Sequence, residues 1–277
     1  MEENRTVHTA LVQMEPAHLD KKRNIDRMVS FVNEAAAGGA QLIVFPELIT
    51  TGYVGPLDTQ EKMGFYQASE PIPGPTTQSI QKIAGEKGVH VIFGMPERGE
   101  SPFGLVMYNV AVMVGPKGVV GLHRKVHLPG NEKLYFTPGN EIKVFDTDLG
   151  RIAMLVCYDF WFPESSRVAA LGGAQIIVDI ANWPSFDIDS WLALGPGNAI
   201  SNLLWLVQVN RVGGESYWPG FGGSQLANPS GKVVVRGAMD KEGIFYGDID
   251  TEEVMTRRSS TYWFDRRPEI YEPLVRG

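Results

Sequence analysis

Three short apolar runs constrain the fold of this chain more than any other feature. They cover residues 42–45, 152–156 and 176–180, and each is only four or five residues long; only the last contains a charged residue, Asp179. Runs of this kind are typical of strands that are covered on both faces, as in the parallel sheets of α/β proteins. Helices are therefore expected between the runs, on the faces of the sheet.

Helical spacing is found in the intervening segments. Asp20 is placed to cap a helix that Gly38-Gly39 ends, and apolar residues fall on one face of it (Ile25, Met28, Val29 and Val32). Further helices are predicted from Thr77 to about Lys87, from about Pro163, and over residues 191–202. We expect Gly195-Pro196-Gly197 to break the last of these.

The other expected strands complete one α/β domain over residues 1–277. They are 6–13, 89–95, a hairpin over 106–123 with its turn at 115–118, 204–209, and a last hairpin with its turn at 228–231. No linker or tandem repeat interrupts the chain. Residues 251–277 are rich in arginine and aromatic side chains, which predicts a C-terminal arm at a subunit interface. A homodimer or a larger even-numbered homo-oligomer is therefore expected.

The overall charge argues against two classes of partner. A formal net charge of −7 and a pI of about 5.3 do not fit a nucleic-acid or anionic-membrane surface. No apolar run reaches the roughly 18–20 residues that span a bilayer, and the polar start of the chain predicts no signal peptide. The single cysteine, Cys157, excludes an intramolecular disulfide and fits a reducing compartment, so the cytoplasm is the expected location.

Polar residues follow each of the three buried runs. Glu47 comes after Leu-Ile-Val-Phe-Pro, Cys157 directly after Leu-Val, and Asn182 after Asp-Ile-Ala. Ligands of α/β sheets gather outside the carboxyl ends of strands, so these three ends are the expected site. Burial disfavours the charged form of a carboxylate, which suits Glu47 to proton transfer near neutrality. An exposed loop glutamate is the alternative interpretation.

Cys157 could serve as a nucleophile or as an inert core residue. A helix that begins near Pro163 would direct its N-terminus toward the sulfur and favour the thiolate. A lone cysteine after an apolar strand is more often a packing residue. The turn-forming sequence that follows Cys157 favours a catalytic role without deciding it.

Lys125 lies in Leu-His-Arg-Lys-Val-His-Leu-Pro, with Glu132 seven residues later. A fixed lysine could neutralise an oxyanion, although a solvated surface lysine is the plainer interpretation of this residue alone. His123 and His127 are four residues apart, but the segment is predicted to be strand and loop, and no third ligand is near. A zinc site is therefore not expected.

Together these segments resemble the nitrilase superfamily of carbon–nitrogen hydrolases, which includes amidases, carbamoylases and nitrilases. The resemblance extends over roughly residues 6–250 and rests on the following motifs: Phe-Pro-Glu47 with Thr51-Gly52-Tyr53, His123-Arg-Lys125-Val-His-Leu with Glu132, Phe136-Thr-Pro-Gly139, Cys157-Tyr-Asp with Pro163-Glu164, Asn210-Arg211-Val212-Gly213, Gly223-Ser224 and Pro229-Ser-Gly231. It implies a four-layer α-β-β-α sandwich that usually dimerises through one helical layer. It also implies a catalytic set of Glu47, Lys125 and Cys157, with Glu132 as the second glutamate and no metal or organic cofactor.

One segment departs from the family pattern. The usual Arg-Ala-Arg-Ala-hydrophobic-Glu-Asn helix is replaced here by Gly195-Pro-Gly-Asn198-Ala-Ile-Ser201-Asn202. Arginine becomes Asn198 and glutamate becomes Ser201, so neither the family's helix start nor the ion pair that commonly braces it is expected here. We expect altered local packing rather than lost chemistry.

The aromatic residues around the site indicate the substrate. Relatives that bind N-carbamoyl-amino acids commonly have an arginine three or four residues after the cysteine, where this chain has Phe160 and Trp161. An apolar pocket favours a small neutral amide, with a nitrile or an N-carbamoyl amine as alternatives. The predicted substrate-binding residues are Tyr53, Tyr158, Phe160, Trp161, Asn182 and Trp183, with the Tyr158 N–H as a second oxyanion donor. Ordinary core packing is the alternative interpretation of the aromatic residues. Two other classes stay open: an amide acyltransferase and a catalytically silent binding protein.

Overall fold

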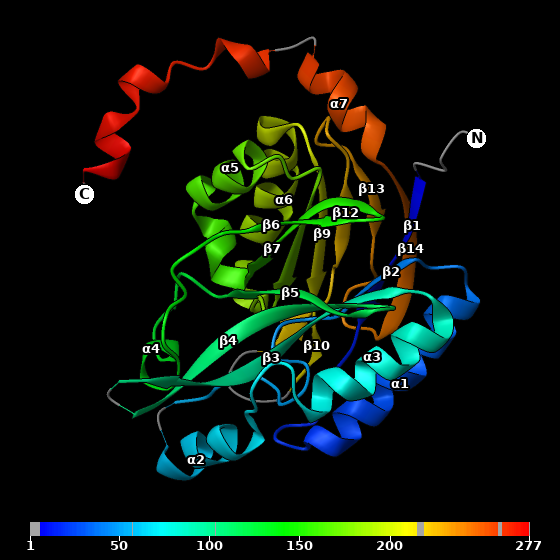
Figure 1. Ribbon diagram of the computed structural model, residues 1–277, viewed down its shortest axis with the longest axis vertical. Coiled ribbons are helices and arrows are strands. Elements are labelled where there is room, and N and C mark those ends of the chain that lie inside the picture. The colour runs from blue at the N-terminus through cyan, green and yellow to red at the C-terminus, as the bar shows by residue number, and fades with distance from the viewer. Residues whose placement is uncertain (1–5, 57, 103, 215–218, 260–261, 277) are drawn as a thin grey trace.

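Two mixed β-sheets pack face to face, with helices on their outer surfaces (Figure 1). The computed structural model describes residues 6–56, 58–102, 104–214, 219–259 and 262–276. The first sheet has the order β14-β1-β2-β3-β4-β5, with bounds β14 (Gly243–Asp250), β1 (Thr6–Gln13), β2 (Leu42–Val44), β3 (His90–Ser101), β4 (Gly104–Gly115) and β5 (Gly118–Arg124). The second has the order β13-β12-β9-β8-β7-β6, with bounds β13 (Val233–Arg236), β12 (Gln225–Ala227), β9 (Trp205–Asn210), β8 (Ile176–Ala181), β7 (Gly150–Val156) and β6 (Val144–Thr147). A short pair, β10 (Val212–Gly213) with β11 (Gly220–Phe221), lies beside them.

The centre of each sheet is parallel, as the short apolar runs predict. Strands β1, β2 and β3 run parallel in the first sheet, and β7, β8 and β9 in the second. Antiparallel strands flank both sets. The carboxyl ends of β2, β7 and β8 therefore lead directly into the segments that carry Glu47, Cys157 and Asn182.

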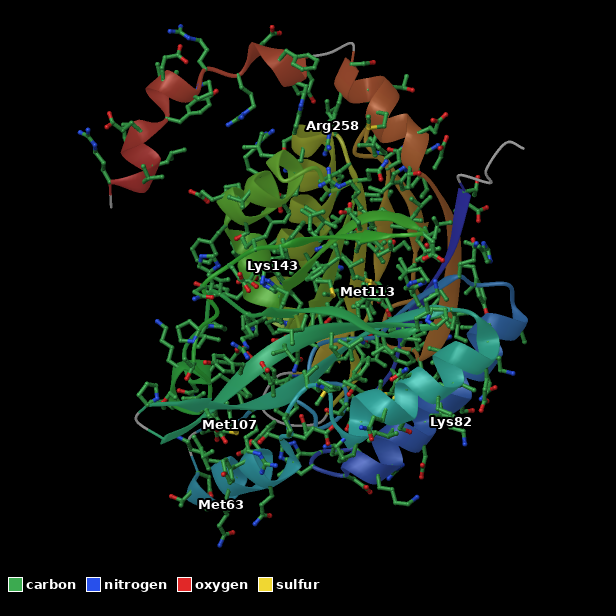
Figure 2. The ribbon with its side chains drawn as sticks, in the orientation of Figure 1. Met63, Lys82, Met107, Met113, Lys143 and Arg258 are labelled. Atoms are coloured by element: carbon green, nitrogen blue, oxygen red, sulfur yellow. The ribbon has the colours of Figure 1, made fainter. Side chains whose placement is uncertain are left out.

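The space between the sheets is filled by an apolar cluster. It includes Leu11 and Val44 from the first sheet and Met154 and Val178 from the second, all without exposed surface. Met113 of β4 belongs to the same cluster, and Figure 2 shows it between the two sheets. Because side chains alternate along a strand, the intervening residues face the outer helices.

Two pairs of helices cover the outer faces. Helices α1 (Lys21–Ala37) and α3 (Pro75–Lys87) pack on the first sheet, while α5 (Pro163–Leu171) and α6 (Ile188–Asn202) pack on the second. Asp20 accepts a hydrogen bond from the Arg23 N–H and caps α1, as predicted. These layers form the four-layer α-β-β-α sandwich that the sequence resemblance implies.

One expectation about the secondary structure needs correction, and several elements were not foreseen. Helix α6 runs unbroken through Pro196, although the sequence predicts a break there. Helices α2 (Thr59–Ala68) and α4 (Glu132–Tyr135), and strand β14, carry weaker sequence patterns and were not predicted. No helix of the described residues is long and apolar enough to cross a membrane.

The projecting C-terminal segment begins later than residue 251. Helix α7 (Thr251–Ser259) follows β14 directly, and its Val254 is fully buried in the cluster between the sheets. Residues 262–276 then form short 3₁₀ turns that extend away from the body, drawn in red in Figure 1. We call residues 262–276 the C-terminal arm.

Candidate active site

The ends of three parallel strands bring Glu47, Cys157 and Asn182 together. The backbone N–H of Asn182, just after β8, donates to Glu47 Oε2 over 2.9 Å. Cys157, just after β7, lines the same pocket as Asn182. All three are nearly inaccessible to solvent, with Glu47 only 1% exposed. The exposed-loop interpretation of Glu47 is therefore wrong.

Lys125 joins two carboxyl groups below the pocket. Its Nζ lies 2.7 Å from Glu47 Oε1 and 2.6 Å from Glu132 Oε1, and all three side chains are at most 1% exposed. The hydroxyl of Tyr53 also donates to Glu132 Oε1. A surface role for Lys125 is thus excluded. Spacing in the sequence does not show this ion pair, because it depends on how the loop of residues 126–131 returns Glu132, the first residue of α4 (Glu132–Tyr135), to Lys125.

Burial and mutual charge shift the proton affinities in this cluster. Burial lowers the pKa of Lys125, but the carboxylates of Glu132 and Glu47 overcome it and hold the pKa well above its ordinary value. Burial raises the pKa of Glu132 to about 7, against the opposing charge of Lys125. Burial and the same carboxylates raise the pKa of Tyr53 well above its usual range. The cluster therefore holds a charged ammonium beside a carboxyl group that can exchange a proton near neutrality.

Two further residues fix Glu47 in this arrangement. Asn109 Nδ2, on β4, donates to Glu47 Oε1 over 2.7 Å and also approaches Glu132 Oε2 at 3.3 Å. Gly94 of β3 lies so close that a Cβ atom there would be 2.3 Å from the Leu48 N and 2.6 Å from the Glu47 Cα. Neither was predicted. The only sequence signal for Asn109 is an amide inside an otherwise apolar strand.

Cys157 occupies the first position of a tight 3₁₀ turn, Cys157–Trp161, in the left-handed region with φ of 50°. The thiol is 7% exposed and lines the pocket. Burial and the charge of Glu47 raise the pKa of Cys157 well above its usual range, although Lys125 opposes them. This direction favours the thiol over the thiolate that the helix N-terminus is expected to favour, and a thiol needs a base before it can attack.

Asp159 connects the lysine segment to this turn and explains the two histidines. Its fully buried carboxylate accepts hydrogen bonds from the His123 ring (2.8 Å), the His127 N–H (2.8 Å) and the Val156 N–H (3.2 Å). These bonds hold the pKa of Asp159 below its ordinary value even though burial raises it. His123 and His127 thus brace Lys125 between them. Within the described residues, no group of three or more His, Cys, Asp or Glu side chains could hold a metal ion.

The pocket above the thiol has a volume of about 310 Å³ and mainly apolar walls. Trp161 stacks on Trp183 with ring centroids 5.6 Å apart and planes 12° from parallel. The described lining residues are Tyr53, Val54, Pro129, Gly130, Asn131, Glu132, Cys157, Tyr158, Trp161, Asn182, Trp183, Pro184, Phe186 and Asp187. None of these is Lys, Arg or His.

Phe160 is not part of this wall, contrary to the sequence prediction. It is fully buried in the cluster of Leu155, Ala169 and Ile177, on the side of the second sheet that faces α5 and α6. The 3₁₀ turn directs Phe160 inward and Trp161 toward the pocket. The other five predicted substrate-binding residues do line it. Arg211 does not, because its guanidinium donates to Asn182 Oδ1 from a fully buried position.

A pocket that places a thiol beside an ammonium and two carboxyl groups can support acyl transfer through sulfur. The carboxyl can accept the thiol proton, and the ammonium can stabilise negative charge on the attacked group. Transfer of the acyl group to water would make such a site that of a hydrolase.

Comparison with known proteins agrees. The sequence model of the carbon–nitrogen hydrolase family matches residues 8–258 of this chain. A probable nitrilase of Schizosaccharomyces pombe is 34% identical over 96% of this chain and 97% of its own length, and an N-carbamoylputrescine amidase of Solanum lycopersicum is 30% identical over 99% and 96%. A solved variant of the Nesterenkonia sp. AN1 amidase, carrying the acetamide moiety of fluoroacetamide covalently at its active-site cysteine, is 25% identical over 97% of both chains, with a TM-score of 0.79. The chain belongs to the carbon–nitrogen hydrolase family of the nitrilase superfamily.

Proposed function

We propose that the chain hydrolyses a small neutral amide to a carboxylic acid and ammonia, with Cys157 as nucleophile, Glu47 as base and Lys125 as oxyanion partner. The observation that carries this proposal is the contact of Lys125 with both Glu47 and Glu132 beside the only thiol of the chain, which lines the pocket. The cysteine adduct of the Nesterenkonia amidase supports the same chemistry.

Acylation begins when Glu47 accepts the proton of the Cys157 thiol. Because the thiol pKa is raised, this transfer accompanies attack of sulfur on the amide carbon. Negative charge then develops on the amide oxygen, where Lys125 and the Tyr158 N–H stabilise it by about 3–4 kcal/mol per donor. The C–N bond breaks, and protonated Glu47 gives its proton to the departing nitrogen. Ammonia is released, and the acyl group stays on Cys157 as a thioester.

Deacylation repeats these steps with water. Glu47 accepts a proton as water attacks the thioester, and Glu132, with a pKa of about 7, helps to orient that water. The C–S bond breaks, the carboxylic acid leaves, and sulfur regains its proton from Glu47. No step requires a metal or an organic cofactor.

Neutral amides are expected to be better substrates than N-carbamoyl-amino acids. A substrate carboxylate in this pocket would lose hydration without meeting a cation among the described lining residues. Such a penalty of several kcal/mol lowers kcat/KM by about a hundredfold or more. The measurement is kcat/KM for an aliphatic amide and for an N-carbamoyl-amino acid of similar size.

Trp161→Arg tests the same wall directly. It should reduce the difference in kcat/KM between the neutral amide and the N-carbamoyl-amino acid, because Trp161 faces the pocket. Met63→Arg, on the exposed surface of α2 (Figure 2), should leave this difference unchanged. Equal kcat/KM values for both substrates in the unmodified protein would refute the neutral-amide assignment. Arginine at buried Phe160 would test folding instead of specificity.

An N-carbamoyl amine is the second candidate substrate. Asp187 and the aromatic rings of Trp161 and Trp183 line the pocket, and a carboxylate and aromatic faces both attract a cation. The tomato relative named N-carbamoylputrescine amidase supports this candidate. A mass-spectrometric screen of amides, nitriles and carbamoyl amines, with and without an added amine acceptor, separates these substrates and distinguishes hydrolysis from acyl transfer.

The chain is further proposed to form a homodimer through α5, α6 and the C-terminal arm. Apolar side chains are exposed there, including Leu171 at 49%, Ile200 at 45% and Phe264 at 75%. Arg258, labelled in Figure 2, anchors the start of the arm by packing over Trp263 at 4.4 Å. These exposed side chains need a partner surface of similar character.

Removing the arm after Ser259 should weaken this assembly without unfolding the body, because Val254 of α7 remains in place. Light scattering should give twice the 30.6 kDa of one chain, or a larger even multiple, for the intact protein and a smaller mass after truncation. A monomer of the intact chain at micromolar concentration would contradict the proposal.

A further inference from the structure

A row of buried polar side chains crosses the second sheet behind the nucleophile. Asp179 of β8, Gln208 of β9, Gln225 of β12 and Arg236 of β13 are direct cross-strand neighbours. The first three have no exposed surface. They face α6, on the side of the sheet away from the apolar cluster that contains Val178 and Val207. We call these four residues the polar ladder.

The hydrogen bonds of the polar ladder all point toward Asp179. Arg236 donates to Gln225 Oε1 (3.3 Å), Gln225 Nε2 to Gln208 Oε1 (2.7 Å), and Gln208 Nε2 to Asp179 Oδ2 (3.0 Å). From the other side, the backbone N–H of Cys157 donates to Asp179 Oδ1 over 2.9 Å. Asp179 must therefore accept on both oxygens, which a carboxylate does and an amide of the same shape cannot.

The orientation of the two glutamine amides is fixed at the Arg236 end of the polar ladder. Gln225 Nε2 also donates to the Trp191 backbone oxygen over 3.0 Å, and Arg236 has only donors. Rotating the Gln225 amide would place its NH₂ against Arg236 and lose the bond to Trp191. Gln208 in turn cannot rotate without opposing the NH₂ of Gln225.

The polar ladder also accounts for the unusual glycine in α6. A Cβ on Gly195 would lie 2.2 Å from Gln208 Oε1 and 2.4 Å from Gln225 Nε2. The Gly195-Pro-Gly segment, which departs from the family pattern, therefore gives α6 the room to pack directly on these two amides.

We infer that Asp179 is a positioning residue for the nucleophile: it holds the Cys157 backbone in its left-handed turn, and the polar ladder holds Asp179. This inference rests on the proposed role of Cys157. The other charged groups that act on the thiol, Glu47, Lys125 and Glu132, come from different elements. Of these, Glu47 also acts on Asp179 through its charge. Asp179 itself lies outside the pocket lining, so it acts on the rate through the position of Cys157 and leaves substrate binding unaffected.

The test is a swap of carboxylate and amide. In Asp179→Asn, the new side-chain NH₂ group would face either the Cys157 N–H or the Gln208 NH₂. Two donors would then oppose each other at one of these positions. We expect kcat for a neutral amide to fall by about tenfold to a hundredfold, the loss typical of a buried hydrogen-bonding group left without its partner, with KM changed less than about twofold. Adding Gln208→Glu restores an acceptor for every donor, so the double variant should recover kcat to within about threefold of the unmodified protein.

Asp148→Asn, at an aspartate whose side chain is 77% exposed, is the matched control and should not change kcat. An unchanged kcat in Asp179→Asn, or a folded double variant as slow as the single one, would overturn the inference. If Asp179→Asn does not fold, the double variant still decides: near-normal kcat supports the inference and a folded, inactive protein refutes it. Retained activity in Cys157→Ala would instead refute the proposed function itself.

Discussion

Cys157→Ala is expected to lose turnover of every amide that the unmodified protein hydrolyses, while it keeps its fold. Cys157 is the only cysteine of the chain and lines the pocket beside Glu132. Without sulfur no thioester can form, and water alone replaces the nucleophile. Removing one small side chain at the pocket floor leaves little cavity, so the loss of unfolding free energy should be about 1 kcal/mol or less. Product release by mass spectrometry and a thermal melt measure the two effects.

Cys157→Ser is the matched control, since it keeps a side chain of similar shape with a much weaker nucleophile. It should bind substrate and turn it over far more slowly than the unmodified protein. Iodoacetamide should inactivate the unmodified protein with one equivalent incorporated and should not label either variant. Full activity in Cys157→Ala would remove the thiol from the mechanism and with it the proposed function.

Local sequence chemistry was sufficient to predict most of the fold. Apolar runs such as 152–156 became the parallel strands, and Asp20 caps its helix as expected, because burial on both faces and capping depend on neighbours in sequence. The break expected at Pro196 did not occur. Proline removes one helix hydrogen bond, but α6 continues through Pro196 at the point where Gly195 packs on the polar ladder, a contact that no local pattern reveals.

The site residues also fall into those that local sequence predicts and those that only the tertiary structure reveals. Glu47, Cys157 and Asn182 were predictable because each ends a parallel strand. Asn109 and Asp179 were not, because their partners are set by which strands lie near one another within each sheet. Phe160 was placed in the pocket wrongly, since sequence offset from the cysteine does not show which residue of a 3₁₀ turn faces inward.

Glu47→Gln is expected to reduce kcat by about a thousandfold, within the range for loss of a general base. The substitution keeps the shape of the side chain, and its oxygen can still accept from Lys125 and Asn109, which lie 2.7 Å from Glu47 Oε1. Its NH₂ group would then face the Asn182 N–H, which donates to Glu47 Oε2 in the unmodified protein. An amide cannot accept the thiol proton, and the raised pKa of Cys157 leaves little thiolate to react without it.

The effect should appear in kcat, with KM changed much less, because Glu47 does not line the substrate pocket. Glu70→Gln is a suitable control, because Glu70 is also buried (6% exposed) and its carboxylate pairs with Lys21 at 2.6 Å, but it lies outside the pocket lining. Loss of this ion pair should lower the free energy of unfolding and leave kcat unchanged. If Glu47→Gln kept kcat within about tenfold of the unmodified protein, the base would have to be another group. Glu132, whose carboxyl has a pKa of about 7 and lines the pocket, would then take that role, and Glu132→Gln should show the larger loss.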